Sequence, residues 1–235
     1  MSASRRGPSQ YNSAVPDIDP TAAELLVSIE DAVVDRFQRC TLPFSDARGG
    51  TPGTAFRCGR LLITASAVVQ GQIGAIELRP DLIEPRGAAS DQLLMRDFSA
   101  QWTHDAASGA AFMDTAGLEA HAAGKGWAWA MQLVTDATAA RSDDVAEVAD
   151  RRVAFVLGHG VDGSSRPLVL IRGAVGATPD GAVRWLEPVR DGLAGSPVFT
   201  VKPLSEGMKV ICLGSLRPDT VVATFDLIRA AAPLM

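Results

Sequence analysis

Cysteine and histidine are scarce in this chain of 235 residues, which has three of each. The cysteines are Cys40, Cys58 and Cys212, and the histidines are His104, His121 and His159. The cysteines are too few for the disulfide framework of a small secreted domain, and the histidines lack the i, i+4 spacing of a helical metal site. We therefore expect no metal and no cofactor. The sequence leaves open whether Cys40 and Cys58 pair.

Long apolar runs and an excess of positive charge are also missing. No stretch is apolar enough to span a membrane, and Arg5 and Arg6 are not followed by the apolar run of a signal peptide. Lys plus Arg is 22 against 27 for Asp plus Glu, a net charge of −5, which lacks the basic footprint of a nucleic-acid-binding protein. We expect a cytoplasmic protein that binds neither nucleic acid nor membrane.

The chain begins with two segments of different character. Residues 1–20 are rich in Ser, Pro, Arg and Asp, which predicts a flexible tail. Within the next segment, 21–40, apolar residues recur at helical spacing and predict a helix over about 22–38. These apolar residues are Leu25, Leu26, Ile29, Val33 and Phe37. We expect the apolar face of this helix to pack on the body of the protein.

Beyond residue 40, short apolar runs alternate with Gly, Pro and Asp, which is typical of a barrel built from many short strands. Alternation of large and small residues predicts a strand over 127–133, and an Ala- and Asp-rich stretch predicts a linking helix over 135–148. Thr224 is a plausible N-cap for a closing helix. The pattern divides the chain into two halves near residues 135–150.

The stretch from Asp191 to Phe199 contains a turn with two glycines and a proline, Gly192-Leu193-Ala194-Gly195-Ser196-Pro197. It resembles the nucleophile turn of trypsin-like serine proteases, where Gly-x-Ser-Gly-x-Pro sets a serine hydroxyl against a histidine and backbone N–H groups form an oxyanion pocket. Ala194 stands at the serine position, and a methyl group cannot attack a carbonyl. Leu193 replaces the acid that receives the new N-terminal amine in activated zymogens. The resemblance therefore implies a relic oxyanion turn without a nucleophile.

A second stretch carries the same resemblance at the family's histidine. Gly53-Thr54-Ala55-Phe56 matches Gly-Thr-Gly-Phe, and the residues from Leu62 to Val69 match Leu-Thr-Ala-x-His-x-Val. The histidine position falls on Ala67. An alanine cannot accept the proton of a nucleophile, so the resemblance implies that the general base is also missing.

A third stretch corresponds to the family's aspartate, which opens a motif Asp-x-Ala-x-Leu. The best match runs from Gly109 to Met113 and places Gly109 at the aspartate. Asp105 and Asp114 lie nearby but out of register. One Ser→Ala replacement is a familiar way to trap a complex, whereas loss at three positions is hard to explain by engineering. The resemblance thus implies a pseudoprotease, although the sequence does not settle whether all the losses are natural.

The matches extend over about residues 45–230 and make the chain similar to trypsin-like domains of the bacterial kind, without vertebrate disulfides. The resemblance implies an all-β fold of two packed six-stranded antiparallel barrels, with an added N-terminal helix and a C-terminal helix. It places the first barrel at 41–135, a linker at 136–150, and the second barrel with the C-terminal helix at 151–235.

Four residues are candidates for the cleft of such a fold: Arg190, Asp191, Ser66 and His104. His104 lies beside Asp105 and can orient a group or act as a base, although a loop histidine is the simpler interpretation. Arg190 can hold an anionic group, although a solvated arginine is the simpler interpretation. His159, between two glycines, reads as a turn residue.

Three functional hypotheses remain open. The first is a proteolytically inactive domain that binds a protein or peptide partner as a regulatory module. The second is a cleft reused for a non-proteolytic reaction on a small molecule, for instance in bacterial biosynthesis, with oxyanion donors and His104 or an aspartate as base. The third is an ordinary protease whose catalytic triad lies at positions other than the three matched above. Whether the chain is an enzyme is not decided by the sequence.

Overall fold

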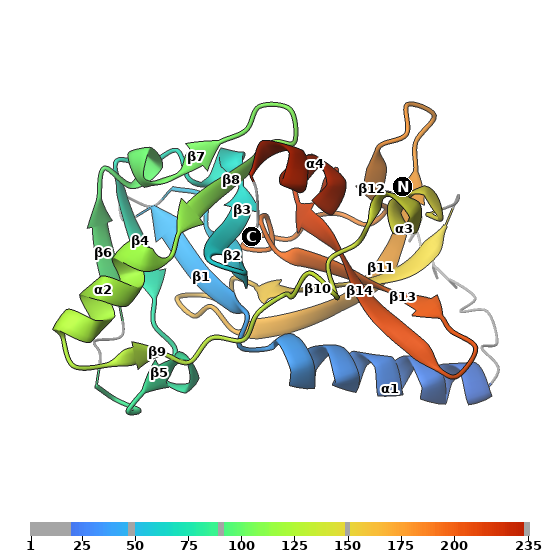
Figure 1. Cartoon of the computed structure of the whole chain (residues 1–235), viewed down its shortest axis with the longest axis horizontal. Coiled ribbons are helices and arrows are strands. Elements are labelled where there is room, and N and C mark those ends of the chain that lie inside the picture. Colours follow the sequence, from blue (N-terminus) through green and yellow to red (C-terminus); the bar gives the residue numbers. More distant parts are fainter. Residues whose placement is uncertain (1–19, 47–49, 89–91, 149–150, 233–235) are drawn as a thin grey trace, which may run out of the picture.

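The computed structural model describes residues 20–46, 50–88, 92–148 and 151–232. The fold is mostly β and is built on two large sheets that lie side by side (Figure 1). Helix α1 (Pro20–Phe37) lies below the second sheet in this view, and helix α4 (Phe225–Ala231) lies at the C-terminal end of the described chain. This confirms the expected trypsin-like arrangement of two barrels with added terminal helices. The predicted tail lies outside the described residues, apart from Pro20 at the start of the first helix.

The first barrel is a curled antiparallel sheet. Its strands are β1 (Thr41–Asp46), β2 (Gly53–Cys58), β3 (Leu61–Ala65), β4 (Ile73–Glu77), β6 (Gln92–Arg96), β7 (Thr103–His104) and β8 (Ala110–Asp114). They are ordered β6-β4-β1-β2-β3-β8-β7, so the sheet has seven strands rather than six. The extra strand arises because left-handed backbone at Asp97, with φ of 50°, and the 3₁₀ turn η3 (Phe98–Gln101) break one strand into β6 and β7.

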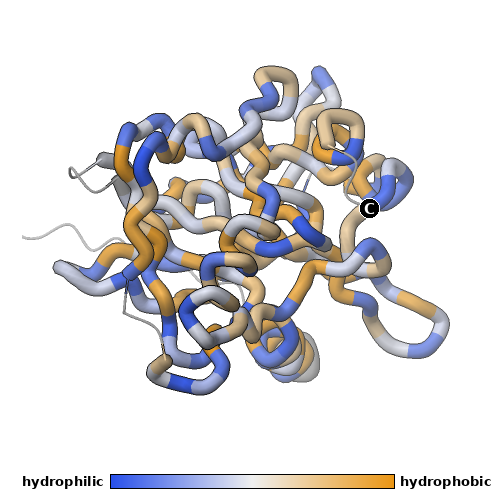
Figure 2. Tube along the Cα trace, turned by 60° about the vertical axis from the view of Figure 1, so that its left-hand side comes forward, coloured by the Kyte–Doolittle hydropathy of each residue, from blue (hydrophilic) through white to orange (hydrophobic). Residues whose placement is uncertain are grey.

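The second barrel is nearly closed. Its strands are β10 (Arg152–His159), β11 (Leu168–Ala177), β12 (Val183–Trp185), β13 (Pro197–Pro203), β14 (Met208–Leu216) and β15 (Val222–Thr224). The order is β12-β11-β10-β13-β14-β15, and a bridge between Arg184 and Val221 brings the two ends of this sheet together. Figure 2 shows hydrophobic and hydrophilic residues interspersed along the whole trace. The central strand β10 departs from simple alternation, because both of its faces are buried: Ala154 and Val156 lie in the core of the second barrel, and Phe155 and Leu157 lie in a core shared with the first.

The remaining elements are short, apart from the first helix. They are α1 (Pro20–Phe37), η1 (Ser66–Val68), η2 (Pro80–Leu82), β5 (Ile83–Glu84), α2 (Ala116–Gly124), β9 (Ala128–Trp129), α3 (Ser142–Ala146) and α4 (Phe225–Ala231). Strands β5 and β9 form a separate small sheet. Among the described residues, no helix combines the length and apolar character needed to cross a bilayer.

Helices α1 and α4 cover a core that both barrels share. The buried face of α1 ends at Phe37, whose ring stacks on Phe199 of β13 with centroids 4.6 Å apart. From α4, Phe225 packs edge-on against Phe56 of β2 at 6.2 Å. Each fully buried phenylalanine stabilises the fold by about 2 kcal/mol. The helical spacing in the sequence therefore identified a helix that packs on the body of the protein.

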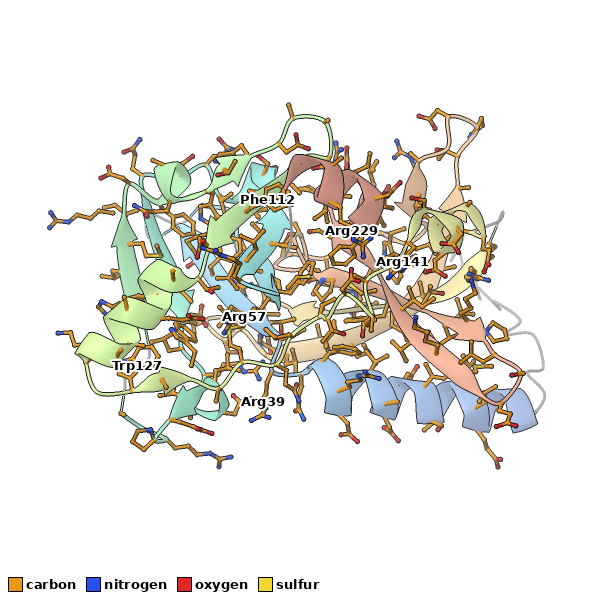
Figure 3. The ribbon with its side chains drawn as sticks, viewed as in Figure 1. Arg39, Arg57, Phe112, Trp127, Arg141 and Arg229 are labelled. Carbon is orange, nitrogen blue, oxygen red and sulfur yellow. The ribbon has the colours of Figure 1, made fainter. Side chains whose placement is uncertain are left out.

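Helix α4 is also tied to the linker by an arginine. Arg229 donates to the carbonyl of Ala140 at 2.5 Å and to Asp136 at 3.0 Å, and Arg141 binds the same carboxyl group at 3.3 Å (Figure 3). Thr224 occupies the expected N-cap position, but its side chain makes no capping hydrogen bond.

The sequence-based expectations for residues 127–148 are wrong in two places. Only Ala128–Trp129 forms a strand, because Gln132 and Val134 instead donate backbone hydrogen bonds to Arg39 and Arg57. The linking helix is confined to α3, because the preceding backbone pairs with β14 through the bridge between Ala139 and Cys212. In both places tertiary pairing overrides the local pattern.

Cys40, Cys58 and Cys212 are buried free thiols within the shared core. Burial raises the pKa of all three, that of Cys58 to about 12. Because the thiolate is the nucleophilic form, these cysteines are inert packing residues at neutral pH.

Candidate functional site

Ala67 and Gly109 come together at one end of the first barrel. Ala67 lies in η1 directly after β3, and Gly109 precedes β8, which pairs with β3 through Ala65 and Ala110. The Ser66 N–H donates to the Gly109 carbonyl at 2.8 Å. The fold therefore brings together the two positions that the resemblance assigned to the histidine and the aspartate.

These residues line a cavity of about 530 Å³ that we call the relic cleft. Its lining consists of Ser66, Ala67, Gln70, Gly109, Arg217, Pro218 and Asp219. Arg190, Asp191, Gly192, Leu193 and Ala194 do not line it. The structure thus joins part of the predicted site and leaves the rest outside this cavity.

Arg217 stands where an acidic side chain at position 109 would point. A Cβ atom added to Gly109 would lie 2.9 Å from the Arg217 guanidinium carbon. The guanidinium is held in place by the Ser108 carbonyl at 3.3 Å and by the Asp219 carboxylate at 2.7 Å. Gly109 also has φ of +69°, a conformation that glycine adopts most readily and that aspartate tolerates better than most residues. An aspartate therefore fits here only if the Arg217 side chain moves.

The turn from Gly192 to Pro197, which we call the relic turn, is buried throughout. Its own bonds run from the Leu193 N–H to the Arg190 carbonyl at 3.1 Å and from the Ser196 N–H to the Leu193 carbonyl at 3.0 Å. Within the described residues, the N–H groups of Gly192 and Ala194 donate to no partner. These are the two donors that the resemblance assigns to an oxyanion pocket.

The relic turn also joins the two barrels. The Ala194 carbonyl accepts from the Thr54 N–H at 2.9 Å, and the Gly192 carbonyl accepts from the Thr54 hydroxyl at 2.8 Å. Ala194 packs into the core of the first barrel, whereas Leu193 packs into the core of the second. The turn therefore has a structural role that does not depend on catalysis.

A serine–histidine pair adjoins the relic cleft. The Ser66 hydroxyl lies 2.6 Å from His104 Nδ1, and His104 Nε2 lies 3.1 Å from the Ser99 carbonyl. Because a carbonyl accepts only, Nε2 carries the proton, and Nδ1 accepts from the serine hydroxyl. A hydroxyl, an imidazole and a carbonyl are thus in contact, which are the groups that nucleophilic catalysis requires, although both side chains reach solvent.

Asp105 does not orient His104, although the two are adjacent in sequence. Its carboxylate accepts from the Ser108 hydroxyl at 2.6 Å and from the Ser108 N–H at 2.7 Å. These hydrogen bonds lower the pKa of Asp105. The aspartate therefore stabilises the loop before Gly109, and the Ser99 carbonyl takes the orienting position.

Arg190 and Asp191, which directly precede the relic turn in the sequence, are exposed. Within the described part of the chain, neither side chain forms an ion pair. Their charges are free to interact with solvent or with a ligand at the protein surface.

His159 is a buried residue of β10 and not the turn residue that its flanking glycines suggested. Its Nδ1 faces the Arg166 carbonyl at 3.2 Å, and its Nε2 faces the Thr41 hydroxyl at 3.2 Å and the Arg79 guanidinium at 3.4 Å. Burial and then the positive charge of Arg79 lower its pKa to about 4. His159 is therefore neutral at pH 7 and has a structural role in the core.

Arg166 bridges the barrels beside His159. Its guanidinium donates to the carbonyls of Phe44, Gly53 and His159 at 3.1, 2.9 and 3.0 Å. Sequence reasoning missed both Arg166 and Arg217, because neither belongs to a motif and their partners are distant along the chain. The run of turn residues Asp162-Gly163-Ser164-Ser165 before Arg166 gives no sign of its role.

The barrels, the relic turn and the relic cleft define a trypsin-like fold. The solved structure of Deg5 agrees with this fold: it matches 91% of this chain and 94% of its own with a TM-score of 0.56 and 13% identity. Catalytically inactive tobacco etch virus protease complexed with substrate matches 77% of this chain and 73% of its own, with a TM-score of 0.48 and 10% identity. The inactive form of the Rv3671c protease covers 91% and 94%, with a TM-score of 0.44 and 13% identity.

No protein-family model matches the chain, and a search of curated proteins finds no match. At identities this low, the likeness to the solved structures shows the fold alone. What the site does must therefore be argued from its own residues.

Proposed function

We propose that this chain is a proteolytically inactive trypsin-like domain that acts as a binding and regulatory module for a protein or peptide partner. The observation that carries the proposal is the Arg217 guanidinium over Gly109, with Ala67 beside it in the same cavity. The position of the family's acid is filled by a fixed cation, and the base and nucleophile positions carry methyl groups. Hydrolysis by the family's mechanism has no residues to perform it.

Retention of the relic turn supports a binding role. The turn is anchored to both barrels, so the fold keeps its shape without the chemistry. Among the described residues its N–H groups at Gly192 and Ala194 have no acceptor, and they can donate to the carbonyl oxygen of a bound peptide. A domain that keeps its recognition surface and has lost its nucleophile can hold a peptide without cleaving it.

A second candidate function rests on the pair of Ser66 and His104. Their 2.6 Å hydrogen bond, with the Arg217 guanidinium in the same cavity as the serine, suits attack on a small anionic ester or phosphoester. In this reaction Ser66 Oγ forms a bond to the carbonyl carbon or phosphorus while its proton passes to His104, and Arg217 stabilises the negative charge that develops. His104 then gives that proton to the departing alcohol as the ester bond breaks. A water molecule, deprotonated by His104, releases the acid product and returns the proton to Ser66. This is the non-proteolytic alternative, in which Ser66 is the nucleophile and His104 is the base.

A fluorophosphonate probe distinguishes the two candidates. The probe bonds to an activated serine with loss of fluoride, and the binding-module proposal expects no adduct at any residue by mass spectrometry of digested protein. An adduct on Ser66 that disappears in Ser66→Ala and His104→Gln would support the second candidate instead. An adduct on any other serine would show that a different nucleophile is active and would contradict both.

A further inference from the structure

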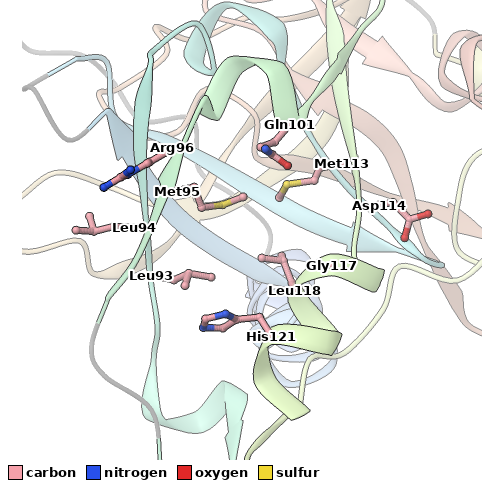
Figure 4. A pocket seen from close by; sticks show the side chains of 10 residues that line it. All are labelled: Leu93, Leu94, Met95, Arg96, Gln101, Met113, Asp114, Gly117, Leu118 and His121. Carbon is pink, nitrogen blue, oxygen red and sulfur yellow. The ribbon is translucent and has the colours of Figure 1, made fainter. Parts of the chain in front are cut away.

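A second cavity of about 520 Å³ opens in the wall of the first barrel between β6, the end of β8 and α2 (Figure 4). It shares no lining residue with the relic cleft. Four consecutive residues of β6, from Leu93 to Arg96, line it, and Met113 of β8 and Leu118 of α2 face them.

The cavity runs along the edge of β6. Successive side chains of a strand point to opposite faces of the sheet, so a cavity that touches four consecutive residues cannot lie on one face alone. β6 ends the strand order and pairs only with β4, and within the described residues no strand pairs with its other edge. In an antiparallel pair, every second residue directs its N–H and C=O groups away from the partner strand. These groups of β6 face the opening.

The opening exists because the strand breaks at Asp97. After the break, β7 pairs with β8 only at Phe112 and Ala111. Within the described residues, Met113 and Asp114, the next residues of β8, therefore pair with no strand on the β7 side. Two strand edges thus flank the cavity.

The lining gives the gap a defined chemistry. Leu93 and Met95 are half-buried and point toward Met113 and Leu118, which are 5% and 7% exposed (Figure 4). On the other face of β6, Leu94 is 64% exposed, more than any other large hydrophobic side chain in the described part of the chain. The inner and outer faces of the edge both offer apolar contact.

The charges at the rim favour an acidic ligand. Arg96 forms no ion pair among the described residues, whereas the carboxylate of Asp114 is already paired with Arg60. His121 projects from α2 into the gap (Figure 4). The unpaired cation at this edge is complementary to a carboxylate.

We propose that the edge of β6 from Leu93 to Arg96 binds an extended segment of a partner protein, which adds to the first barrel as a further strand. Alternate apolar side chains of the segment enter between Met95 and Met113, and an acidic side chain lies beside Arg96. Backbone hydrogen bonds supply affinity, and the side-chain contacts supply specificity. This inference rests on the proposed binding function and gives that function a site away from the relic cleft.

The test uses fluorescein-labelled nine-residue peptides with apolar residues at alternate positions and either Asp or Lys between them. We expect saturable binding by fluorescence anisotropy, with acidic peptides bound at least about 10-fold more tightly than basic ones. Leu94→Ser, which removes an apolar contact without adding charge, and Arg96→Glu should each weaken the acidic peptides by about 10-fold or more. Leu227→Ser, at a 44% exposed position on α4, is the matched control and should change nothing. Binding should also slow amide hydrogen exchange over residues 93–96.

Three other outcomes would overturn the proposal that the β6 edge binds a partner segment. Ala67→Trp fills the relic cleft, and loss of binding in this variant with normal binding in Leu94→Ser would move the site to that cleft while the binding function stands. Concentration-dependent self-association that Leu94→Ser abolishes would identify a second copy as the occupant. If no peptide binds saturably, both the site and peptide binding as a function lose their support.

Discussion

Substituting Gly195 by alanine should cost more than about 4 kcal/mol of folding stability, although the residue takes no part in any proposed chemistry. Its backbone has φ of +89°, and an added Cβ would lie 2.0 Å from the Thr64 hydroxyl and 2.1 Å from the Thr54 carbonyl. The carbonyl belongs to the backbone of the first barrel and cannot give way without moving that strand. Strain and overlap therefore add at a position where the barrels meet.

Gly181→Ala is the matched control for this experiment. Gly181 has a similar φ of +83°, but nothing lies within 4 Å of an added Cβ. Only the backbone strain remains there, and a loss of about 1 to 2 kcal/mol is expected. The comparison uses urea unfolding at neutral pH. Equal losses in the two variants would show that the relic turn is not packed between the barrels as described.

Stability should also fall by about 3 kcal/mol as the pH is lowered from 7.5 to 4, because of His159. Its pKa is about 4 in the folded chain against an ordinary value of 6.5. The unfolded chain therefore takes up a proton as the pH falls through 6.5, while the folded chain does not until about pH 4. Protonation then favours unfolding across this window. Carboxylates with lowered pKa values, such as those of Asp81 and Asp144, add their own losses at the acidic end and below it.

The measurement is the free energy of urea unfolding at intervals of pH. His159→Gln keeps a donor and an acceptor in the core and should flatten the slope between pH 6.5 and 4.5. His121→Gln is the control, because the His121 side chain is exposed on α2. If the slope persists in His159→Gln and vanishes in His121→Gln, the pH dependence comes from His121, which would contradict this prediction.

Local signals in the sequence predicted much of the fold. The apolar spacing from Leu26 to Phe37 reflects a real amphipathic stripe, whereas Leu25, which the pattern also included, is 44% exposed. The order of the three family-like stretches predicted the barrels. These features depend on residues close together in sequence, which a pattern can capture.

The site depends on contacts that no local pattern encodes. Arg217 reaches the Ser108 carbonyl across 109 positions, and Ser66 meets His104 across 38. The break at Asp97 that opens the edge of β6 comes from one residue in left-handed backbone, and the sequence around it reads as an ordinary strand and loop. His159 was misread because its glycines suggested a turn, whereas Gly158 is needed so that β10 can pack closely on Ser196.

The most direct test of the central claim is incubation of the full chain with a diverse peptide library, followed by mass spectrometry of the whole mixture. An active trypsin-like protease under the same conditions serves as the positive control. Recovery of every peptide intact, including those that bind, is the expected result for a domain with Ala67, Gly109 and Ala194 at the catalytic positions. Cleavage that increases with time and with protein concentration, and that persists after a second purification, would contradict it.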